Sequence, residues 1–253
     1  MSRLLVIPAA GLGSRLGAAV PKVLVRVEGA TMLDRLLALY EGAVDRVVIV
    51  VNPAFADSVR DHVAGHRLAA RIDCVEQSSP TGMLDAILLG LPAAARDQPS
   101  SIWITWCDQV AVHPKTIERL ASLTSSPTPD ALVMPTVQQV QPYIHLERDA
   151  SGRITRVLHR REGDVMPATG ESDMGLFALS AAAYQQELPA YARNVEAGRA
   201  TGERNFLPFI PWIARTRNVV TFPSENSMEA VGVNTPEELA LIEAHLRTLY
   251  PVP

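Results

Sequence analysis

An apolar run near the N-terminus leads into a loop of small residues followed by two cations. Residues 4–7 read Leu-Leu-Val-Ile, and such a run predicts a buried strand. The small residues after it are Ala9, Ala10, Gly11, Gly13 and Ser14. Small side chains let backbone N–H groups approach a ligand closely, and Arg15 and Lys22 add two positive charges. We therefore predict that this loop binds the phosphates of a nucleoside triphosphate.

Two common phosphate-binding motifs do not fit this loop. The dinucleotide fingerprint G-x-G-x-x-G needs a glycine where the chain has Leu16, and the P-loop motif fails because Val23 follows Lys22. What remains is the string A-A-G-x-G-x-R-x-G, followed by P-K. It resembles the sugar-1-phosphate nucleotidyltransferase family, and within it the uridyltransferase domain of bacterial N-acetylglucosamine-1-phosphate uridyltransferases. The resemblance implies that Lys22 balances charge at the α-phosphate and Arg15 at the departing pyrophosphate, so both are candidate catalytic residues.

A second candidate group follows the third predicted strand. The stretch from Gln77 to Gly82 has the pattern Q-x-x-P-x-G, which resembles the base-reading loop of the same family. A glutamine side chain offers a donor and an acceptor side by side, so it can pair with the imide edge of uracil or thymine. The amide can also turn to suit cytosine. We predict a pyrimidine nucleotide with UTP or dTTP favoured; a plain surface turn is the structural alternative.

Two oxygen-bearing residues, distant in the sequence, are candidates for a magnesium site. Asp108 follows a predicted buried strand, and ligands bind at the carboxyl ends of parallel strands. Asn234 ends the stretch E-x-x-G-V-N, which resembles a late family motif whose asparagine completes the metal site. Mg²⁺ prefers hard oxygen ligands, few of them from the protein. We predict Mg²⁺ as the cofactor; the structural alternatives are a turn or N-cap role for Asp108 and a plain loop role for Asn234.

The acceptor-binding region resembles the family less closely. Tyr143 aligns with a tyrosine-glycine pair of the family but lacks the glycine, and Asp173 stands where the family has asparagine. Glu203 belongs to a Gly-Glu pair that resembles one in the family, and Trp106 precedes the candidate metal ligand by two residues. We predict that these four residues bind the acceptor. Leu158 replaces the family's sugar-binding carboxylate, which puts N-acetylglucosamine 1-phosphate in doubt as the acceptor.

The predicted reaction joins an NTP to a sugar 1-phosphate and releases pyrophosphate. An acceptor phosphate oxygen attacks the α-phosphorus in line, and it is ionised near pH 7 because the second pKa of a phosphate monoester is about 6. Catalysis then rests on positioning and charge stabilisation. Two alternatives stay open. One is a cytidylyltransferase for a phosphorylated alcohol such as phosphocholine, with Trp103, Trp106 or Trp212 in an aromatic cage; the other is a non-catalytic nucleotide-binding regulatory protein.

Composition limits the other classes of protein. The chain has 253 residues, of which 47% are hydrophobic, and a formal net charge of −4. This charge, without a long basic run, argues against nucleic-acid binding. Cys74 and Cys107 are too few for a disulfide framework or a zinc site. Because no signal-peptide pattern and no apolar stretch of about 18 residues occurs, we expect a cytoplasmic protein without a membrane partner.

The alternation of strands and helices predicts an α/β fold. The expected strands are 4–7, 46–51, 71–75, 102–106, 132–134 and 174–179, and the expected helices are 31–40, 54–63, 81–91, 181–192 and one from 235. This order predicts a mostly parallel, Rossmann-like sheet with helices on both faces. Residues 143–158 are expected to form a small antiparallel hairpin, and residues 162–173 an irregular loop near the substrate.

The length favours one domain over two. We treat residues 1–253 as a single nucleotidyltransferase domain, with a nucleotide-binding half at about 1–124 and an acceptor-binding half at 125–253.

Overall fold

A computed structural model describes residues 2–11, 16–17, 20–126, 128–224 and 226–249 of the chain. The strands are β1 (Arg3–Ala9), β2 (Arg26–Val27), β3 (Ala30–Thr31), β4 (Arg46–Val51), β5 (Ile72–Glu76), β6 (Ser101–Thr105), β7 (Leu132–Val140), β8 (Ile144–Arg148), β9 (Ile154–His159), β10 (Thr169–Asp173), β11 (Leu176–Ser180) and β12 (Val219–Pro223). The α-helices are α1 (Met32–Tyr40), α2 (Ala56–Ala64), α3 (Met83–Leu88), α4 (Leu91–Asp97), α5 (Pro114–Leu123), α6 (Leu188–Ala192), α7 (Phe209–Ile213) and α8 (Pro236–Leu249).

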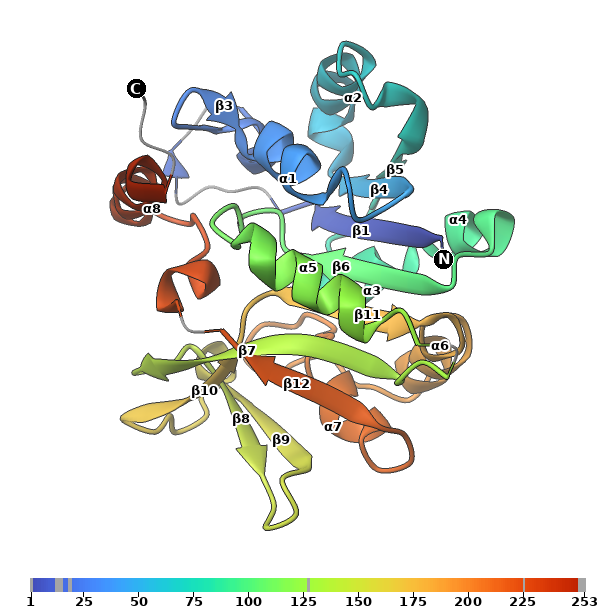
Figure 1. Ribbon diagram of the computed structural model, residues 1–253, viewed down its shortest axis with the longest axis vertical. Helices are drawn as coiled ribbons and strands as arrows, with labels where there is room; N and C mark the ends of the chain where they lie inside the picture. The colour runs from blue at the N-terminus through green and yellow to red at the C-terminus, as the bar shows by residue number, and fades with distance from the viewer. Residues whose placement is uncertain (1, 12–15, 18–19, 127, 225, 250–253) are drawn as a thin grey trace.

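An eight-stranded sheet runs through the whole molecule (Figure 1). Its order is β10-β7-β11-β6-β1-β4-β5, and β12 also pairs with β7. Strands β6, β1, β4 and β5 are parallel, whereas β11 runs antiparallel to both β6 and β7. The predicted mostly parallel, Rossmann-like α/β fold is therefore confirmed, together with the antiparallel β8–β9 hairpin. The carboxyl ends of the four parallel strands meet at one edge of the sheet.

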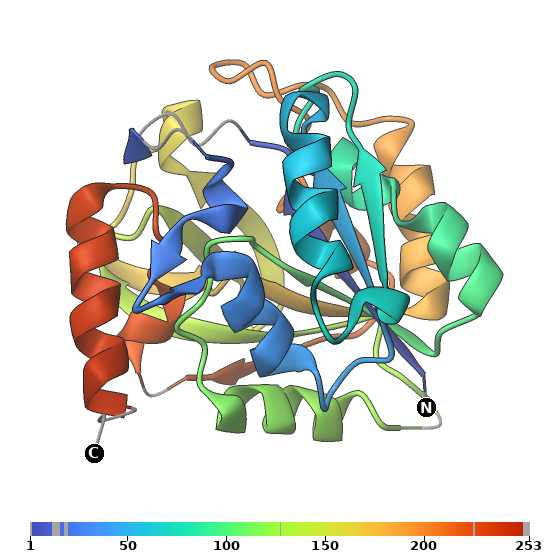
Figure 2. The ribbon, with the colours of Figure 1, turned by 90° about the horizontal axis from the view of Figure 1, so that it is seen from above.

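The sheet separates two apolar cores. Alternate residues of β1 point to opposite faces, so Leu5 and Ile7 join one buried cluster, and Leu4 and Val6 join the other. The first core is covered by α1, α2, α5 and α8, and the second by α3, α4, α6 and α7. Figure 2 shows helices on both sides of the sheet. Strands buried on both faces explain why these segments read as continuous apolar runs.

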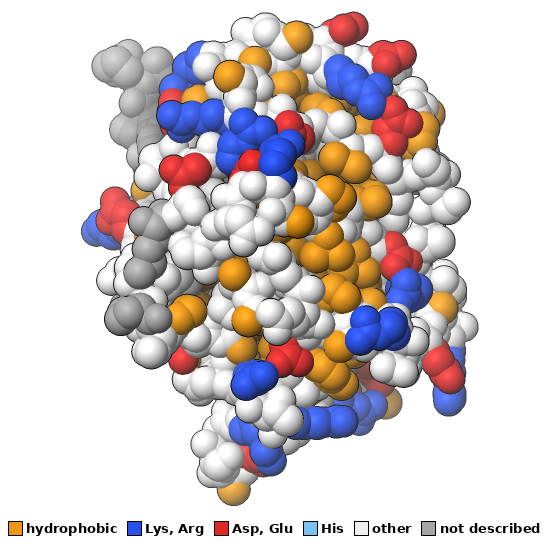
Figure 3. Space-filling view, turned by 90° about the vertical axis from the view of Figure 1, so that its right-hand side faces the viewer, with side chains coloured by type: hydrophobic (Ala, Val, Ile, Leu, Met, Phe, Trp, Pro, Cys, Tyr) orange, Lys and Arg blue, Asp and Glu red, His pale blue; other side chains and the backbone are white. Residues whose placement is uncertain are grey.

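The face seen from the side of α4 and α6 is not fully polar. Hydrophobic side chains form a band down this face between charged ones (Figure 3). Helices α3, α4 and α6 pack their apolar residues on the second core from this side. Among the described residues, no helix is long and apolar enough to cross a membrane.

Local signals predict several elements well. Thr31 and Asp34 form the expected capping box of α1, and Thr235 and Glu238 make the same reciprocal bonds at the start of α8. The β8–β9 turn contains Gly152 with a φ of +84°, the positive value expected for a tight hairpin. These expectations are confirmed.

Two expectations about elements are wrong. Residues 169–173 belong to a strand, β10, because β7 continues to Val140 and provides a pairing edge beyond the three residues expected. The helix expected at 81–91 is split into α3 and α4. At the break, the Tyr184 hydroxyl donates to the Ile87 carbonyl over 2.6 Å and occupies the space beside Gly90, where a Cβ would lie 2.5 Å from Tyr184 Oη.

Candidate functional site

The phosphate loop and the base-reading loop start side by side at the carboxyl edge of the sheet. Asn52, directly after β4, donates from Nδ2 to the Ala10 carbonyl over 3.3 Å. The Gln77 backbone N–H, directly after β5, donates to the carbonyl of Val51 over 2.9 Å. The predicted residues Ala9, Ala10 and Gly11 lie at this edge, whereas Gly13, Ser14 and Arg15 lie outside the described residues.

Lys22 joins the two candidate metal ligands. Its Nζ donates to Asp108 Oδ2 over 2.5 Å and to Asn234 Oδ1 over 2.8 Å. The side chains of Lys22 and Asp108 are only 12% and 13% exposed, so water screens their attraction less than at an open surface. Three predicted site residues from distant parts of the chain therefore meet, with two oxygens bound to the Lys22 ammonium.

The backbone around Gly232 holds the two oxygens in place. Val233 donates its N–H to the Asp108 carbonyl over 3.2 Å, and Asn234 Nδ2 donates to the Gly232 carbonyl over 3.2 Å. The second bond turns Asn234 Oδ1 toward the ammonium. Gly232 itself leaves room for the carboxylate, because a Cβ there would lie 2.9 Å from both Asp108 Cγ and Oδ2. Asn234 is also anchored to α8, since its N–H donates to Glu238 Oε2 over 2.8 Å.

This donor set fits a magnesium ion. One carboxylate oxygen and one amide oxygen converge on a single cation, the Lys22 ammonium. Both are hard oxygen ligands, and Mg²⁺ usually takes one or two such groups from a protein and the rest from phosphates and water. Asp108 and Asn234 are therefore the residues that could hold the ion.

The base-reading loop has a defined internal geometry. Gln77 is 9% exposed, and its Nε2 donates to the Gly82 carbonyl over 3.1 Å. Gly82 has a φ of +123°, and a Cβ at this position would lie 2.5 Å from the backbone N and O of Arg204. The glycine is thus required by the close approach of another chain segment as well as by its own backbone conformation.

Two of the predicted acceptor residues meet at Gly175. Trp106 donates its backbone N–H to the Gly175 carbonyl over 2.9 Å, and Asp173 Oδ1 accepts from the Gly175 N–H over 2.7 Å. The Trp106 ring packs on Phe177, with ring centroids 5.2 Å apart. Asp173 is buried, and this burial raises the pKa of its carboxyl group to about 6.

Tyr143 and Glu203 belong to the surrounding loops. The Tyr143 ring lies edge-on to His159, with centroids 5.2 Å apart, and His159 Nδ1 lies 3.0 Å from Asn205 Nδ2. Burial lowers the pKa of His159. Glu203 uses its carbonyl to accept from the Gly198 N–H over 2.8 Å, so its backbone shapes the turn that precedes Asn205.

The tryptophans considered for an aromatic cage are divided among different packing groups. Trp103 is fully buried in the first core and packs edge-on to Tyr40, at 6.4 Å between ring centroids. Trp106 and Trp212 belong to the second core, where Trp212 stacks on Phe209 at 5.8 Å. The three rings therefore do not form one cage.

Glu229 has a role that the sequence did not reveal. This buried carboxylate accepts hydrogen bonds from the His113 N–H at 2.9 Å, the Thr116 hydroxyl at 2.6 Å and the Ser224 hydroxyl at 2.7 Å. It fastens the start of the Gly232 segment to the first turn of α5. Its place in the E-x-x-G-V-N string was the available signal, but only the contacts show what the carboxylate does.

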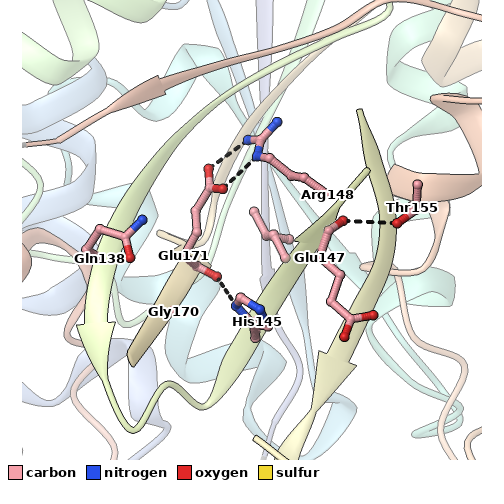
Figure 4. A pocket seen from close by; sticks show the side chains of 8 residues that line it. Gln138, His145, Glu147, Arg148, Thr155, Gly170 and Glu171 are labelled. Atoms are coloured by element: carbon pink, nitrogen blue, oxygen red, sulfur yellow. Dashed lines mark hydrogen bonds and ion pairs between the residues drawn. The ribbon is translucent and has the colours of Figure 1, made fainter. Parts of the chain in front are cut away.

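A shallow hollow elsewhere on the molecule is separate from these residues. It has a volume of about 520 Å³ and lies among β7, β8, β9 and β10 (Figure 4). Arg148 and Glu171 form a two-bond ion pair across it, both bonds 2.7 Å long, and His145 Nδ1 lies 3.0 Å from the Glu171 carbonyl oxygen. None of the predicted site residues lines it, and its main charges already neutralise one another.

A comparison with protein families agrees with this fold. A model of the MobA-like NTP transferase domain matches residues 5–174, more than half of the chain, and the chain belongs to this family. The predicted class of enzyme is therefore confirmed. The matched region contains Lys22, Gln77 and Asp108, whereas Asn234 lies beyond it.

Curated relatives match almost the whole of this chain. The Bifunctional protein GlmU of Pseudomonas entomophila is 28% identical over 247 residues, covering 97% of this chain and 52% of that protein. The Azotobacter vinelandii protein of the same name is 28% identical over 252 residues, covering 98% and 52%. The chain spans about half the length of these curated relatives.

Two solved structures share the fold. A Bacillus anthracis protein described as a candidate glucose-1-phosphate thymidylyltransferase superimposes with a TM-score of 0.77 at 12% identity, covering 97% of this chain and 96% of that one. HddC of Yersinia pseudotuberculosis superimposes with a TM-score of 0.69 at 20% identity, covering 97% and 100%.

Proposed function

We propose that this protein transfers a nucleotidyl group from UTP or dTTP to a sugar 1-phosphate and releases pyrophosphate. The observation that carries the proposal is the convergence of Lys22, Asp108 and Asn234 at the carboxyl edge of the sheet. One structural neighbour is described as a candidate glucose-1-phosphate thymidylyltransferase, which agrees with a sugar phosphate as the acceptor. Residues 1 to about 124 would supply most of the groups that bind the nucleotide, and residues 125–253 most of those that bind the acceptor.

The chain's own residues contribute charge and position. Lys22 donates hydrogen bonds to phosphate oxygens of the bound NTP and stabilises the negative charge that develops at the α-phosphate. Asp108 and Asn234 would hold Mg²⁺, which supplies further positive charge to the phosphates when bound. Trp106 and Asp173 form part of the wall against which the acceptor is positioned, so that its ionised phosphate meets the α-phosphorus in line.

The orientation of Gln77 favours uracil or thymine over cytosine. Because Nε2 donates to the Gly82 carbonyl, Oε1 is available to accept the imide N–H of the base. Cytosine has an acceptor at that ring position, and turning the amide to suit it would put two acceptor oxygens together at Gly82. An unsatisfied polar group of this kind costs about 1–3 kcal/mol. We expect UTP or dTTP to be preferred over CTP by roughly ten- to a hundredfold.

Pyrophosphate release tests this proposal. The purified protein is assayed with ATP, GTP, CTP, UTP and dTTP against glucose 1-phosphate, N-acetylglucosamine 1-phosphate and phosphocholine, with Mg²⁺ present. We expect release with a sugar phosphate and UTP or dTTP, much slower release with CTP, and none with ATP or GTP. Gln77→Ala should lower this turnover by roughly one to two orders of magnitude.

Other outcomes would contradict the proposal. Preferred use of CTP with phosphocholine would identify an alcohol-phosphate cytidylyltransferase. Nucleotide binding without pyrophosphate release on any acceptor of the panel would support a regulatory, non-catalytic protein.

A further inference from the structure

The backbone of Arg204 forms hydrogen bonds with the base-reading loop on both sides of Gly82. The Arg204 N–H donates to the Thr81 carbonyl over 2.8 Å, and the Arg204 carbonyl accepts from the Leu84 N–H over 3.0 Å. Between these two bonds, Gly82 comes so close that a Cβ would lie 2.5 Å from the backbone N and O of Arg204. Since Arg204 belongs to the second half of the chain, a distant segment sets the path of this loop.

The side chain of Arg204 locks this segment in place. One guanidinium nitrogen, Nη1, pairs with the Asp85 carboxylate in the first turn of α3, and a second, Nη2, donates to the Ala192 carbonyl at the end of α6. The Arg204 and Asp85 side chains are 30% and 21% exposed. A planar guanidinium can serve two partners in fixed directions at once, which a lysine ammonium on a flexible stem does less well.

The position of Gly82 in turn sets the orientation of Gln77, the residue proposed to read the base. The Gly82 carbonyl, which Arg204 positions through its neighbours, is the acceptor for Gln77 Nε2. That single bond decides which end of the Gln77 amide faces the ligand. If the loop relaxes, the Gly82 carbonyl no longer holds the Gln77 amide in one orientation. The amide can then turn to pair with cytosine as well as with uracil or thymine.

We propose that Arg204 is a positioning residue that sets the base selectivity of the site. Its contacts with Asp85 and with Ala192 hold Gly82, and through Gly82 hold Gln77 in the orientation that reads an imide. The proposal rests on the proposed function, because it names a further determinant of the same base-binding site.

Base discrimination in variants tests the inference. The selectivity is the kcat/KM for UTP or dTTP, whichever the wild type prefers, divided by the kcat/KM for CTP. This ratio is measured for the wild type, Arg204→Ala, Arg204→Lys and Asp85→Asn. We expect the ratio to fall about tenfold toward one in Arg204→Ala, and to fall also in the other two variants. The KM for the acceptor should stay within a few-fold. Asn205→Ala, which loses the contact with His159, should instead change the acceptor KM.

Controls separate selectivity from folding. Arg217→Ala removes an exposed arginine that pairs with Glu187 and should change neither the ratio nor kcat. If Arg204→Ala lowers the melting temperature, Arg204→Lys and Asp85→Asn are compared at a temperature where all proteins are folded. An unchanged ratio in all three variants, with or without lower stability, would show a merely structural role and overturn the inference.

Failure of the proposed function is recognised separately. A wild-type protein that releases no pyrophosphate from any triphosphate would contradict that function. The inference is then judged by calorimetric binding of UTP and CTP to the same variants, where the ratio of dissociation constants must move toward one for it to stand.

Discussion

The ammonium of Lys22 lies 2.5 Å from the carboxylate of Asp108, although 86 positions separate them in the chain. The pair is nearly covered, with exposed fractions of 12% and 13%. Breaking one partner of such a pair leaves an uncompensated charge, so both side chains depend on each other in the absence of substrate. Each residue is therefore tested with a substitution of similar shape, together with a check of the fold.

Asp108 should be needed for turnover even at temperatures where the variant remains folded. We expect Asp108→Asn to lower kcat by about 10²–10³, because the substitution keeps the shape and removes the charge that would hold the metal. Pyrophosphate release over a Mg²⁺ titration measures this effect, with thermal melting to check the fold. Asp57→Asn, at a side chain that is 97% exposed, is the matched control. A rate near that of the wild type at saturating Mg²⁺ would contradict the metal assignment.

Lys22 should act on the chemical step. We expect Lys22→Met to lower kcat by about 10²–10³ while the KM for the acceptor changes little, since the ammonium stabilises charge on the phosphates. Lys115 is the chain's only other lysine and is exposed, so Lys115→Met is a close control. Steady-state kinetics distinguish the two. Loss confined to KM, with kcat unchanged, would mean that Lys22 contributes only to binding.

A methyl group at Gly232 should disturb the metal site without replacing either of the residues that would hold the ion. In Gly232→Ala, the new Cβ would lie 2.9 Å from the Asp108 carboxylate and push it aside. We expect the Mg²⁺ concentration for half-maximal rate to rise, and kcat/KM to fall by about tenfold, a barrier change of about 1.4 kcal/mol. Gly42→Ala meets nothing within 4 Å and should leave both quantities unchanged. An unaltered Mg²⁺ dependence in Gly232→Ala would argue against this geometry.

The free energy of unfolding should fall as the pH rises, because Asp173 loses its proton while buried. Burial raises the pKa of its carboxyl from 3.8 to about 6, so between these values the folded state binds more protons than the unfolded state. The free energy of unfolding therefore falls from pH 4 to pH 6 and stays lower above pH 6. Asp173→Asn keeps an acceptor for the Gly175 N–H and removes the charge.

Urea denaturation at two pH values measures this effect. We expect Asp173→Asn to be more stable than the wild type by up to about 3 kcal/mol at pH 8, with a much smaller difference at pH 4. Asp149→Asn is the contrasting variant, because hydrogen bonds, first of all from the Ser151 hydroxyl, lower the pKa of Asp149 to about 2. A stability difference at Asp173 that does not vary with pH would contradict the role of its charge.

Features of the fold that depend on neighbouring residues were predictable from the sequence. The capping box at Thr31, the proline-led start of α8 and the hairpin turn at Gly152 each involve residues within a few positions of one another. The runs that form β1 and β4 are apolar because both faces of the central sheet are covered. Each of these features depends on residues that are close together in the sequence, so the sequence alone predicts them.

The candidate site was predictable only where its residues match a family motif. Lys22, Asp108 and Asn234 were named from separate strings, but the Lys22 ammonium meets both oxygens only because the Gly232 segment packs against the residues after β6. Strand β10 was missed because its pairing edge on β7 lies about thirty positions away. Arg204 and Glu229 were missed for the same reason. Their partners are distant in sequence, and a buried or bridging charge is stabilised only by neighbours that folding brings to it.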